Sequence, residues 1–163
     1  MMEYYGNNHL IHLAEFSVED VLPYRKTKKG STREYVVNKK IYSVKMASHR
    51  YQIFAKSTVC ACCGLVGSKM ILDISHYDFN RNARPHFNLY AVWDNCFVLM
   101  TKDHIVPRSK GGKNDISNYQ TMCCLCNSAK SDHDVTVEEL RTFDTVAERI
   151  EKIREDKQLF VKM

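Results

Sequence analysis

The chain has few of the residues that dominate repetitive and disordered chains. Its 163 residues include only 6 glycines and 3 prolines, whereas a collagen-like repeat or a low-complexity linker is rich in both. Hydrophobic residues make up 44% of the sequence and charged residues 26%, which is typical of globular proteins. A chain of this length buries roughly two-thirds of the surface that it exposes when unfolded, so we expect it to fold alone.

Long apolar runs are also absent. No run approaches the roughly 20 apolar residues that a membrane-spanning helix needs. Residues 1–8 have neither the basic flank nor the apolar core of a secretory signal. We therefore expect a soluble protein of the cytoplasm with no membrane partner.

Acidic side chains are nearly absent from residues 25–50, where nine Lys and Arg residues face a single acid, Glu34. Residues 132–157 reverse this balance, with nine acids and five bases. A basic segment of this kind favours contact with a phosphate backbone, and the alternative is a solvated charged surface. The residues expected to contact nucleic acid are Arg25, Lys26, Lys28, Lys29 and Arg33, with Arg108, Lys110 and Lys113 from a later loop.

The seven cysteines do not indicate a disulfide framework, because their number is odd and the chain lacks the signs of a secreted protein. Four of them form two Cys-x-x-Cys pairs, a spacing at which a tight turn aims two thiolates at one zinc ion. A span of 59 residues separates the pairs, so one structural zinc would join the two ends of a long insert. The predicted ligands are Cys60, Cys63, Cys123 and Cys126.

Adjacent cysteines leave the register of these ligands open. Cys62 lies beside Cys63, and Cys124 lies beside Cys123, so either could replace its neighbour at the metal. The alternative to a zinc site is that the two cysteine clusters simply pack against other residues.

Turn residues and side-chain patterns divide the N-terminal third into short elements. Residues 1–22 are mixed, apart from a short helix that Ser17 caps and Pro23 ends. Residues 34–44 are rich in β-branched and aromatic side chains and predict a hairpin. A helix over residues 48–59 then leads to the first cysteine pair.

The second half of the chain contains clearer extended patterns. Residues 86–106 predict two strands around a two-residue turn, and a short strand over 118–122 leads into the second cysteine pair and a helix. A capping-box pattern at Thr136 begins a C-terminal helix that we expect to run to about Asp156. Residues 70–88 predict only an irregular or partly extended insert.

One segment combines these elements in a known order. It contains Asp103-His104-Ile105-Val106-Pro107-Arg108-Ser109-Lys110-Gly111-Gly112, then Asn118, then Cys123-x-x-Cys126-Asn127-x-x-Lys130. The order of strand, Asp-His, polar loop, strand, cysteine pair and helix strongly resembles the ββα-metal core of HNH endonucleases. The resemblance covers about residues 60–131 and implies that His104, Asn118 and Asn127 are the three signature residues.

The resemblance also implies a division of chemical roles. His104 would act as general base on a water molecule, while Asp103 and Asn127 would hold a catalytic Mg²⁺ or Mn²⁺ through oxygen ligands. Asn118 would brace the loop that positions His104. Lys130 would meet phosphate or the charge that develops during the reaction, and Zn²⁺ would be structural.

The expected fold is α+β. A zinc-stapled HNH core (60–131) would lie between a basic N-terminal hairpin and helix region (1–59) and a C-terminal helix (132–163). The implied function is that of a metal-dependent DNA endonuclease of the phage or homing type. It would act on double-stranded DNA in a bacterial or phage-infected cell, as a monomer or homodimer without a small-molecule cofactor. Two alternatives stay open, a Holliday-junction-type resolvase and a zinc-stapled module that binds nucleic acid without cleaving it.

Overall fold

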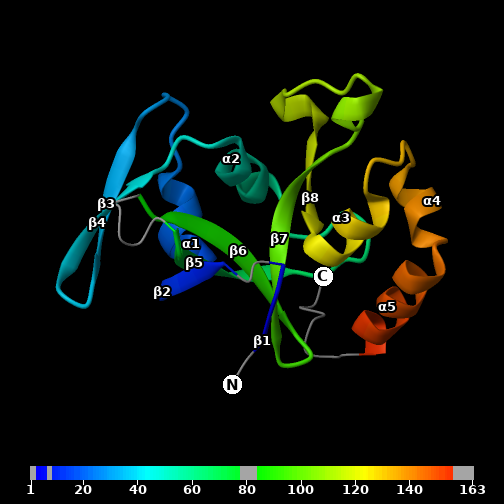
Figure 1. The fold of residues 1–163 in the computed structure, drawn as a ribbon, viewed down its shortest axis with the longest axis horizontal. Coiled ribbons are helices and arrows are strands. Elements are labelled where there is room, and N and C mark those ends of the chain that lie inside the picture. The colour runs from blue at the N-terminus through cyan, green and yellow to red at the C-terminus, as the bar shows by residue number, and fades with distance from the viewer. Residues whose placement is uncertain (1–2, 7–8, 78–83, 156–163) are drawn as a thin grey trace.

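A mixed β-sheet forms the centre of the protein (Figure 1). A computed structural model describes residues 3–6, 9–77 and 84–155. Within these residues the sheet order is β1-β7-β6-β5-β2, and β8 pairs with the second half of β7. β1 runs parallel to β7, and the other pairs are antiparallel. The strands are β1 (Glu3–Tyr5), β2 (Leu10–Ser17), β5 (Gly67–Ser75), β6 (His86–Trp93), β7 (Cys96–His104) and β8 (Tyr119–Cys123).

A separate hairpin and several short helices surround this sheet. The hairpin, β3 (Thr32–Val37) and β4 (Lys40–Lys45), lies at the left of Figure 1, whereas the last two helices lie at the right. The mixture of helices and strands confirms the predicted α+β class. No helix in the described ranges is long and apolar enough to cross a membrane. The helical segments are α1 (Val18–Val21), η1 (Leu22–Tyr24), α2 (His49–Lys56), η3 (Arg108–Lys110), η4 (Ile116–Asn118), α3 (Cys124–Lys130), α4 (Val137–Arg141) and α5 (Asp144–Glu155).

Both predicted hairpins are present, and the geometry of their turns explains why local sequence predicts them. Asn38 and Lys39 have φ values of 48° and 65°, and Asp94 and Asn95 have φ values of 50° and 57°. Two consecutive residues at positive φ match the twist of the flanking strands. Asn and Asp tolerate this conformation better than most residues. The second hairpin, β6–β7, carries the strand on which the candidate site is built.

The expectation that residues 70–88 are partly extended is confirmed, but the segment is not an irregular insert where it is described, because β5 and the start of β6 occupy much of it. Residues 78–83 lie outside the described part of the chain. Strand β5 is buried on both faces: Leu72 packs in the main core, and Ile71 packs in a second cluster with Tyr90. A strand buried on both faces lacks the alternation of apolar and polar residues by which strands are recognised.

Residues 1–22 are more regular than expected, since they include β1 and β2. The predicted helix is present as α1, where the Ser17 hydroxyl accepts a hydrogen bond from the Asp20 N–H at 3.1 Å. Pro23 does not end the helical segment, because it lies inside η1, which directly follows α1. Strands from the predicted 1–59 region therefore join the same sheet as the core strands.

The single C-terminal helix that the sequence predicts is in fact two helices, α4 and α5. Thr136 and Glu139 form the expected capping box at the start of α4. The chain then turns, with the Thr142 N–H bonded to the Glu139 carbonyl at 3.0 Å. The apolar spacing continues through this break because both helices pack on the same core. The expected end near Asp156 lies outside the described residues.

A buried carboxylate connects four strands on the second face of the sheet. Asp73 of β5 is fully buried, and it accepts hydrogen bonds from His12 at 2.5 Å, Asn88 at 2.7 Å and Tyr90 at 3.1 Å. Tyr4 of β1 stacks on the His12 ring, with centroids 3.8 Å apart. Strands β1, β2, β5 and β6 therefore meet around one buried charge.

Asp73→Ala is expected to lower the free energy of unfolding by about 3 kcal/mol or more, because the buried donors of Asn88 and Tyr90 lose this acceptor. The control is Glu15→Ala, which removes the exposed Glu15–Lys69 pair (3.8 Å) between β2 and β5 and should cost less than about 1 kcal/mol. Urea denaturation of the two full-length variants measures the difference. Equal losses would contradict a stabilising role for the Asp73 network.

Candidate functional site

The end of β7, the loop that follows it and α3 surround a cavity of about 290 Å³. Asp103 and His104 line it from the strand end, and Asn127 lines it from α3. Consecutive residues of a strand point to opposite faces, but β7 ends at His104, and both residues line the cavity there. The remaining lining residues are Lys102, Pro107, Arg108, Ser109, Ser131 and Asp132.

Asn114 and Tyr119 orient the ring of His104. The Nε2 atom of His104 lies 2.8 Å from the Asn114 side-chain oxygen, and the Tyr119 hydroxyl donates to that same oxygen at 3.2 Å. Tyr119 also meets the His104 ring edge-on, with centroids 4.7 Å apart. Because an amide oxygen only accepts, Nε2 is the nitrogen that carries the proton in the neutral imidazole, and Nδ1 is then the acceptor. The imidazole is thus arranged to accept a proton at Nδ1.

A buried lysine holds Asp103. Lys130 is 2% exposed, and its ammonium group donates to Asp103 Oδ2 at 2.7 Å and to the carbonyl oxygens of His104 and Ile105. Gln120 donates to the same carboxylate oxygen at 2.9 Å. An ammonium group has three donors, so Lys130 uses its whole hydrogen-bonding capacity inside the protein. A contact with phosphate, as the resemblance implies for this residue, would require one of these bonds to break.

The oxygen atoms around the cavity fit a divalent cation. Oδ1 of Asp103 has no hydrogen-bond partner in the described chain. The Asn127 amide group donates to the Thr101 hydroxyl at 3.0 Å, which leaves its oxygen available as a ligand. One carboxylate and one amide oxygen suit Mg²⁺ or Mn²⁺, which keep several water ligands. Because Lys130 already offsets part of the Asp103 charge, we expect the cation to be weakly held.

Asn118 closes the loop between β7 and β8. Its side-chain oxygen accepts the Val106 N–H at 2.9 Å, and its amide group donates to the carbonyls of Val106 and Lys113, each at 3.0 Å. The loop is so tight that a Cβ at Gly112 would lie 1.8 Å from the Val106 carbonyl oxygen. These contacts hold the loop that carries Asn114.

Four cysteine thiols converge beside the sheet. Their sulfur atoms all lie within 4.8 Å of one another, and all four residues are buried. The Cys63 and Cys123 sulfurs are 3.7 Å apart, close to the roughly 3.8 Å of a tetrahedral site with Zn–S bonds of about 2.3 Å. Hydrogen bonds among these thiols lower the pKa of Cys60 and raise the pKa of Cys63, because the groups are close enough to share protons. The cluster fits a closed, structural zinc site made of Cys60, Cys63, Cys123 and Cys126.

The geometry favours one of the registers that the sequence leaves open. In the described ranges, the cluster contains neither Cys62 nor Cys124. Cys124 lies next to the end of β1, since a Cβ on Gly6, the residue after that strand, would lie 3.0 Å from the Cys124 sulfur. Burial raises the pKa of the Cys124 thiol to about 11. None of the seven cysteines forms a disulfide.

Two arginines from the C-terminal helices support the cysteine cluster. Arg149 of α5 donates to the Cys126 sulfur at 3.4 Å. Arg141 of α4 donates to the carbonyls of Ala61 and Cys62 at 2.9 Å and 2.8 Å. A guanidinium group is favourable beside zinc-bound thiolates, because four of them exceed the charge of the ion. No spacing pattern predicts these contacts, since they join residues far apart in the chain.

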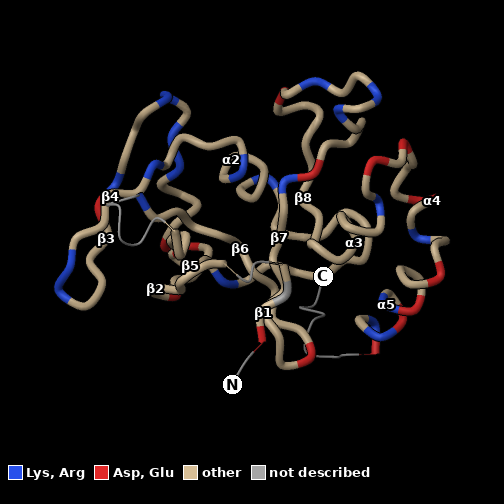
Figure 2. The backbone as a smooth tube through the Cα atoms, in the orientation of Figure 1, with Lys and Arg blue, Asp and Glu red and all other residues tan. Residues whose placement is uncertain are grey.

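The predicted nucleic-acid-binding residues lie mainly on two loops, one between η1 and β3 and the other between β7 and β8. The tips of both loops point to the top of Figure 2. Two members of the set are engaged within the protein. Arg25 donates to the Leu22 carbonyl at 3.2 Å, and the Arg33 guanidinium lies 3.3 Å from the Tyr24 ring centroid. The members exposed to solvent on the two loops are Arg25, Lys26, Lys28, Lys29, Arg108, Lys110 and Lys113.

Sequence reasoning missed three residues that contact the candidate catalytic pair: Asn114, Tyr119 and Gln120. The register of β7 and β8 places Gln120 opposite Asp103 and Tyr119 opposite His104. Cross-strand partners lie on the same face of a sheet, so these residues can be identified only after the two strands are aligned. Asn114 gives no signal of its own, because it lies in a polar loop.

A comparison with known protein families identifies the same segment of the chain. Residues 92–133 match the family model for HNH endonuclease. The match spans β7, the following loop, β8 and α3, and it confirms the resemblance to HNH endonucleases over these residues. It covers less than half of the chain and leaves out the first cysteine pair. No curated protein and no solved structure matches the chain.

Cys126→Ser is expected to lose zinc and cooperative unfolding, because structural zinc contributes on the order of 10 kcal/mol to the folding of small domains. The control is Cys124→Ser, which changes a neighbouring cysteine outside the cluster and should keep its zinc. Metal analysis of freshly purified protein should find about one zinc per chain in the wild type and in the control. Zinc loss in both variants, or a wild type without zinc, would contradict this assignment.

Proposed function

We propose that this protein is a metal-dependent endonuclease that hydrolyses phosphodiester bonds in double-stranded DNA. The observation that carries the proposal is that Asp103, His104 and Asn127 line one cavity, within the segment that matches the HNH endonuclease model. Phosphodiester hydrolysis needs an activated water in line with the scissile phosphate and positive charge near the phosphate oxygens. These three side chains supply groups for both requirements.

His104 acts as the general base. Its Nε2–H stays bonded to Asn114, so Nδ1 takes the proton from the attacking water. The water oxygen bonds to phosphorus, the bond to the leaving sugar oxygen breaks, and solvent returns a proton to that oxygen. Tyr119 packs against the ring and limits its rotation. The imidazole therefore reaches the transition state without losing its orientation.

Asp103 and Asn127 would hold a Mg²⁺ or Mn²⁺ ion, which would supply positive charge to the phosphate oxygens. When bound, the cation neutralises the negative charge that builds on these oxygens. Lys130 keeps the carboxylate oriented from the buried side through the 2.7 Å contact to Oδ2, so its role is positioning. Asn118 holds the loop that carries Asn114, and zinc in the cysteine cluster is structural.

Exposed cations on the two loops supply the attraction for DNA. Binding that neutralises phosphates releases counterions, so the affinity for DNA should fall steeply with salt concentration. The acidic helices α4 and α5 lie at the right of Figure 2, away from the basic loop between η1 and β3. We expect DNA to avoid these helices. The predicted contacts are Lys26, Lys28 and Lys29, with Arg25 and Arg33 beside them, and Arg108, Lys110 and Lys113 next to the cavity.

His104→Ala should lower DNA cleavage by about 10²- to 10⁴-fold, because general-base catalysis typically contributes that factor. Affinity for uncut DNA should hardly change, because the cationic loops are intact. The measurement is conversion of supercoiled plasmid to nicked or linear forms in Mg²⁺, Mn²⁺ or EDTA. A wild-type protein that cleaves in no metal would reject the proposed function.

Asp103→Asn separates loss of the metal from loss of the base. The amide still fills the site beside Lys130 but binds a divalent cation more weakly than a carboxylate does. Cleavage by this variant should therefore recover partly at high Mg²⁺ or Mn²⁺ concentration, whereas His104→Ala should not respond to added metal. Equal metal dependence of the two variants would argue against separate roles.

Asn114 is expected to act as a positioning residue for His104. Asn114→Ala frees the imidazole and should reduce kcat by roughly 10- to 100-fold, the usual cost of removing a side chain that orients a catalytic ligand. Asn114→Asp keeps an acceptor for Nε2–H, and its negative charge favours the imidazolium form. The activity of that variant should therefore rise only at higher pH than in the wild type. Superimposable pH profiles of Asn114→Asp and the wild type would contradict this role.

A further inference from the structure

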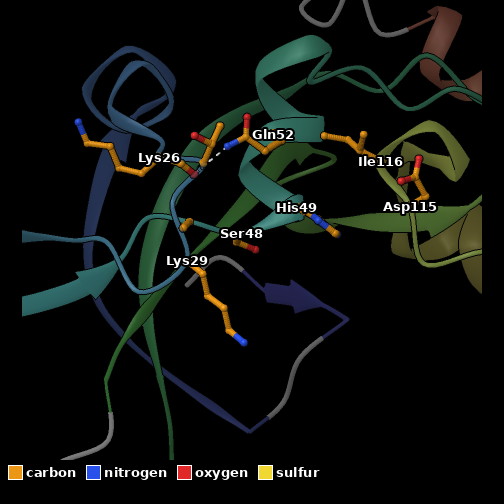
Figure 3. Close-up of a pocket in the computed structure, with 9 residues that line it drawn as sticks. Lys26, Lys29, Ser48, His49, Gln52, Asp115 and Ile116 are labelled. Atoms are coloured by element: carbon orange, nitrogen blue, oxygen red, sulfur yellow. Dashed lines mark hydrogen bonds between the residues drawn. The ribbon is translucent and has the colours of Figure 1, made fainter.

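A second cavity lies beside the candidate active site, with a volume of about 390 Å³ (Figure 3). Three segments that are far apart in the sequence form its walls: the basic loop before β3, the first turn of α2, and the turn that leads into β8. Its lining residues are Lys26, Thr27, Lys29, Ala47, Ser48, His49, Gln52, Asp115 and Ile116.

Hydrogen bonds within the walls hold this cavity in shape. Gln52 of α2 donates to the Lys26 carbonyl at 2.9 Å, which fastens the basic loop to the helix. Asp115 accepts the N–H and hydroxyl of Ser117 at 2.9 Å and 2.6 Å, and these bonds lower its pKa. The carboxylate charge is therefore partly satisfied by its own turn.

The cations at this cavity are available to a ligand. Lys26 and Lys29 are exposed, and in Figure 3 their side chains extend outward to the rim rather than across the cavity. Neither forms a salt bridge with any residue in the described ranges. His49 is also exposed and lies on the other side, next to Asp115 and Ile116. Lys26 or Lys29 can therefore bind an anion at the rim without first losing an ion pair within the protein.

Tyr119 links this cavity to the candidate catalytic histidine. The Tyr119 ring centroid lies 5.6 Å from the His49 ring centroid and 4.7 Å from the His104 ring centroid. The distance between the two histidine rings therefore cannot exceed these two distances added together. The Lys102 ammonium lies 3.8 Å from the same ring centroid and adds positive charge beside Tyr119. Each nucleotide of a strand advances about 3.4 Å along the axis of a duplex, so a strand cut at His104 reaches His49 within about three nucleotides.

We propose that this cavity binds the sugar–phosphate backbone of the substrate strand beside the scissile phosphate. His49 donates to one phosphate oxygen, and Lys26 and Lys29 meet the phosphate that follows. The inference rests on the proposed function, since that function places the scissile phosphate at His104. The cavity volume lies within the roughly 300 to 1,000 Å³ of sites for small organic ligands, so it accepts a nucleotide unit rather than a bare ion. Asp115 can accept a hydrogen bond from an amino group of the base.

The first test observes His49 directly and does not depend on cleavage. Zinc-loaded, full-length protein is titrated with a thymidine trinucleotide, and the imidazole C–H resonances are followed by NMR. The matched control is His9, which is also exposed and tilted against a tyrosine, Tyr77, at a centroid distance of 6.4 Å. We expect a saturable shift of His49, little change at His9, and a much weaker response to the uncharged methylphosphonate trinucleotide. A His49 response no larger than that of His9 would overturn the proposal.

The second test compares two variants that lose the same charge. Lys26→Ala/Lys29→Ala removes the rim cations, and Lys39→Ala/Lys40→Ala removes two exposed lysines at the hairpin tip. The first variant should bind the trinucleotide roughly three- to thirtyfold more weakly than the wild type, as expected for two exposed ion pairs. The second should bind it like the wild type. Equal weakening would assign the effect to overall charge and overturn the subsite.

The two proposals fail in distinguishable ways. A protein that cuts no DNA but shows the His49 shift and the rim-lysine effect would reject the nuclease and support a nucleotide subsite. A protein that cuts DNA while His49 is unresponsive would support the nuclease and overturn the subsite.

Discussion

A lysine ammonium group that is almost cut off from water sets the geometry of the candidate active site. Lys130 belongs to α3, but it bonds to the Asp103 carboxylate and to the carbonyls of His104 and Ile105 at the end of β7. Leaving a buried charge without its partner costs several kcal/mol, so α3 cannot move away from β7 without a large penalty. This one contact positions Asp103 and, through the helix, Asn127 relative to His104.

The cysteine cluster places the other end of the same helix. Cys123 caps α3, with its sulfur accepting the Cys126 N–H at 3.4 Å, and Asn127 is the next residue. The cluster also joins α3 to the first cysteine pair, and Arg149 connects it to α5. Zinc bound there would lie outside the cavity that contains His104. It would still fix the position of α3 at the start of the helix, while Lys130 fixes the position of α3 at its end.

The N-terminal region contributes more to the structure than a basic surface. Strands β1 and β2 extend the main sheet, and α2 brings His49 next to Tyr119. The basic loop is fastened to α2, so Lys26 and Lys29 line the second cavity rather than lying at the end of a free arm. Charge patterning predicts that this region is basic, but charge alone cannot show which cations face the site. That depends on how the loop packs against the core.

Local sequence determined the features that depend on a few consecutive residues. These are the two hairpin turns, the capping box at Thr136, the spacing of the cysteine pairs, and the Asp-His and Cys-Asn motifs of the segment that matches the HNH endonuclease model. Tertiary structure alone decided that Lys130 turns inward to Asp103, that Asn114 bonds to His104, and that β5 is buried on both faces. A turn or a cap is stabilised by its own residues. These contacts instead depend on strand register and packing between residues distant in the chain, and neither leaves a periodic pattern in the sequence.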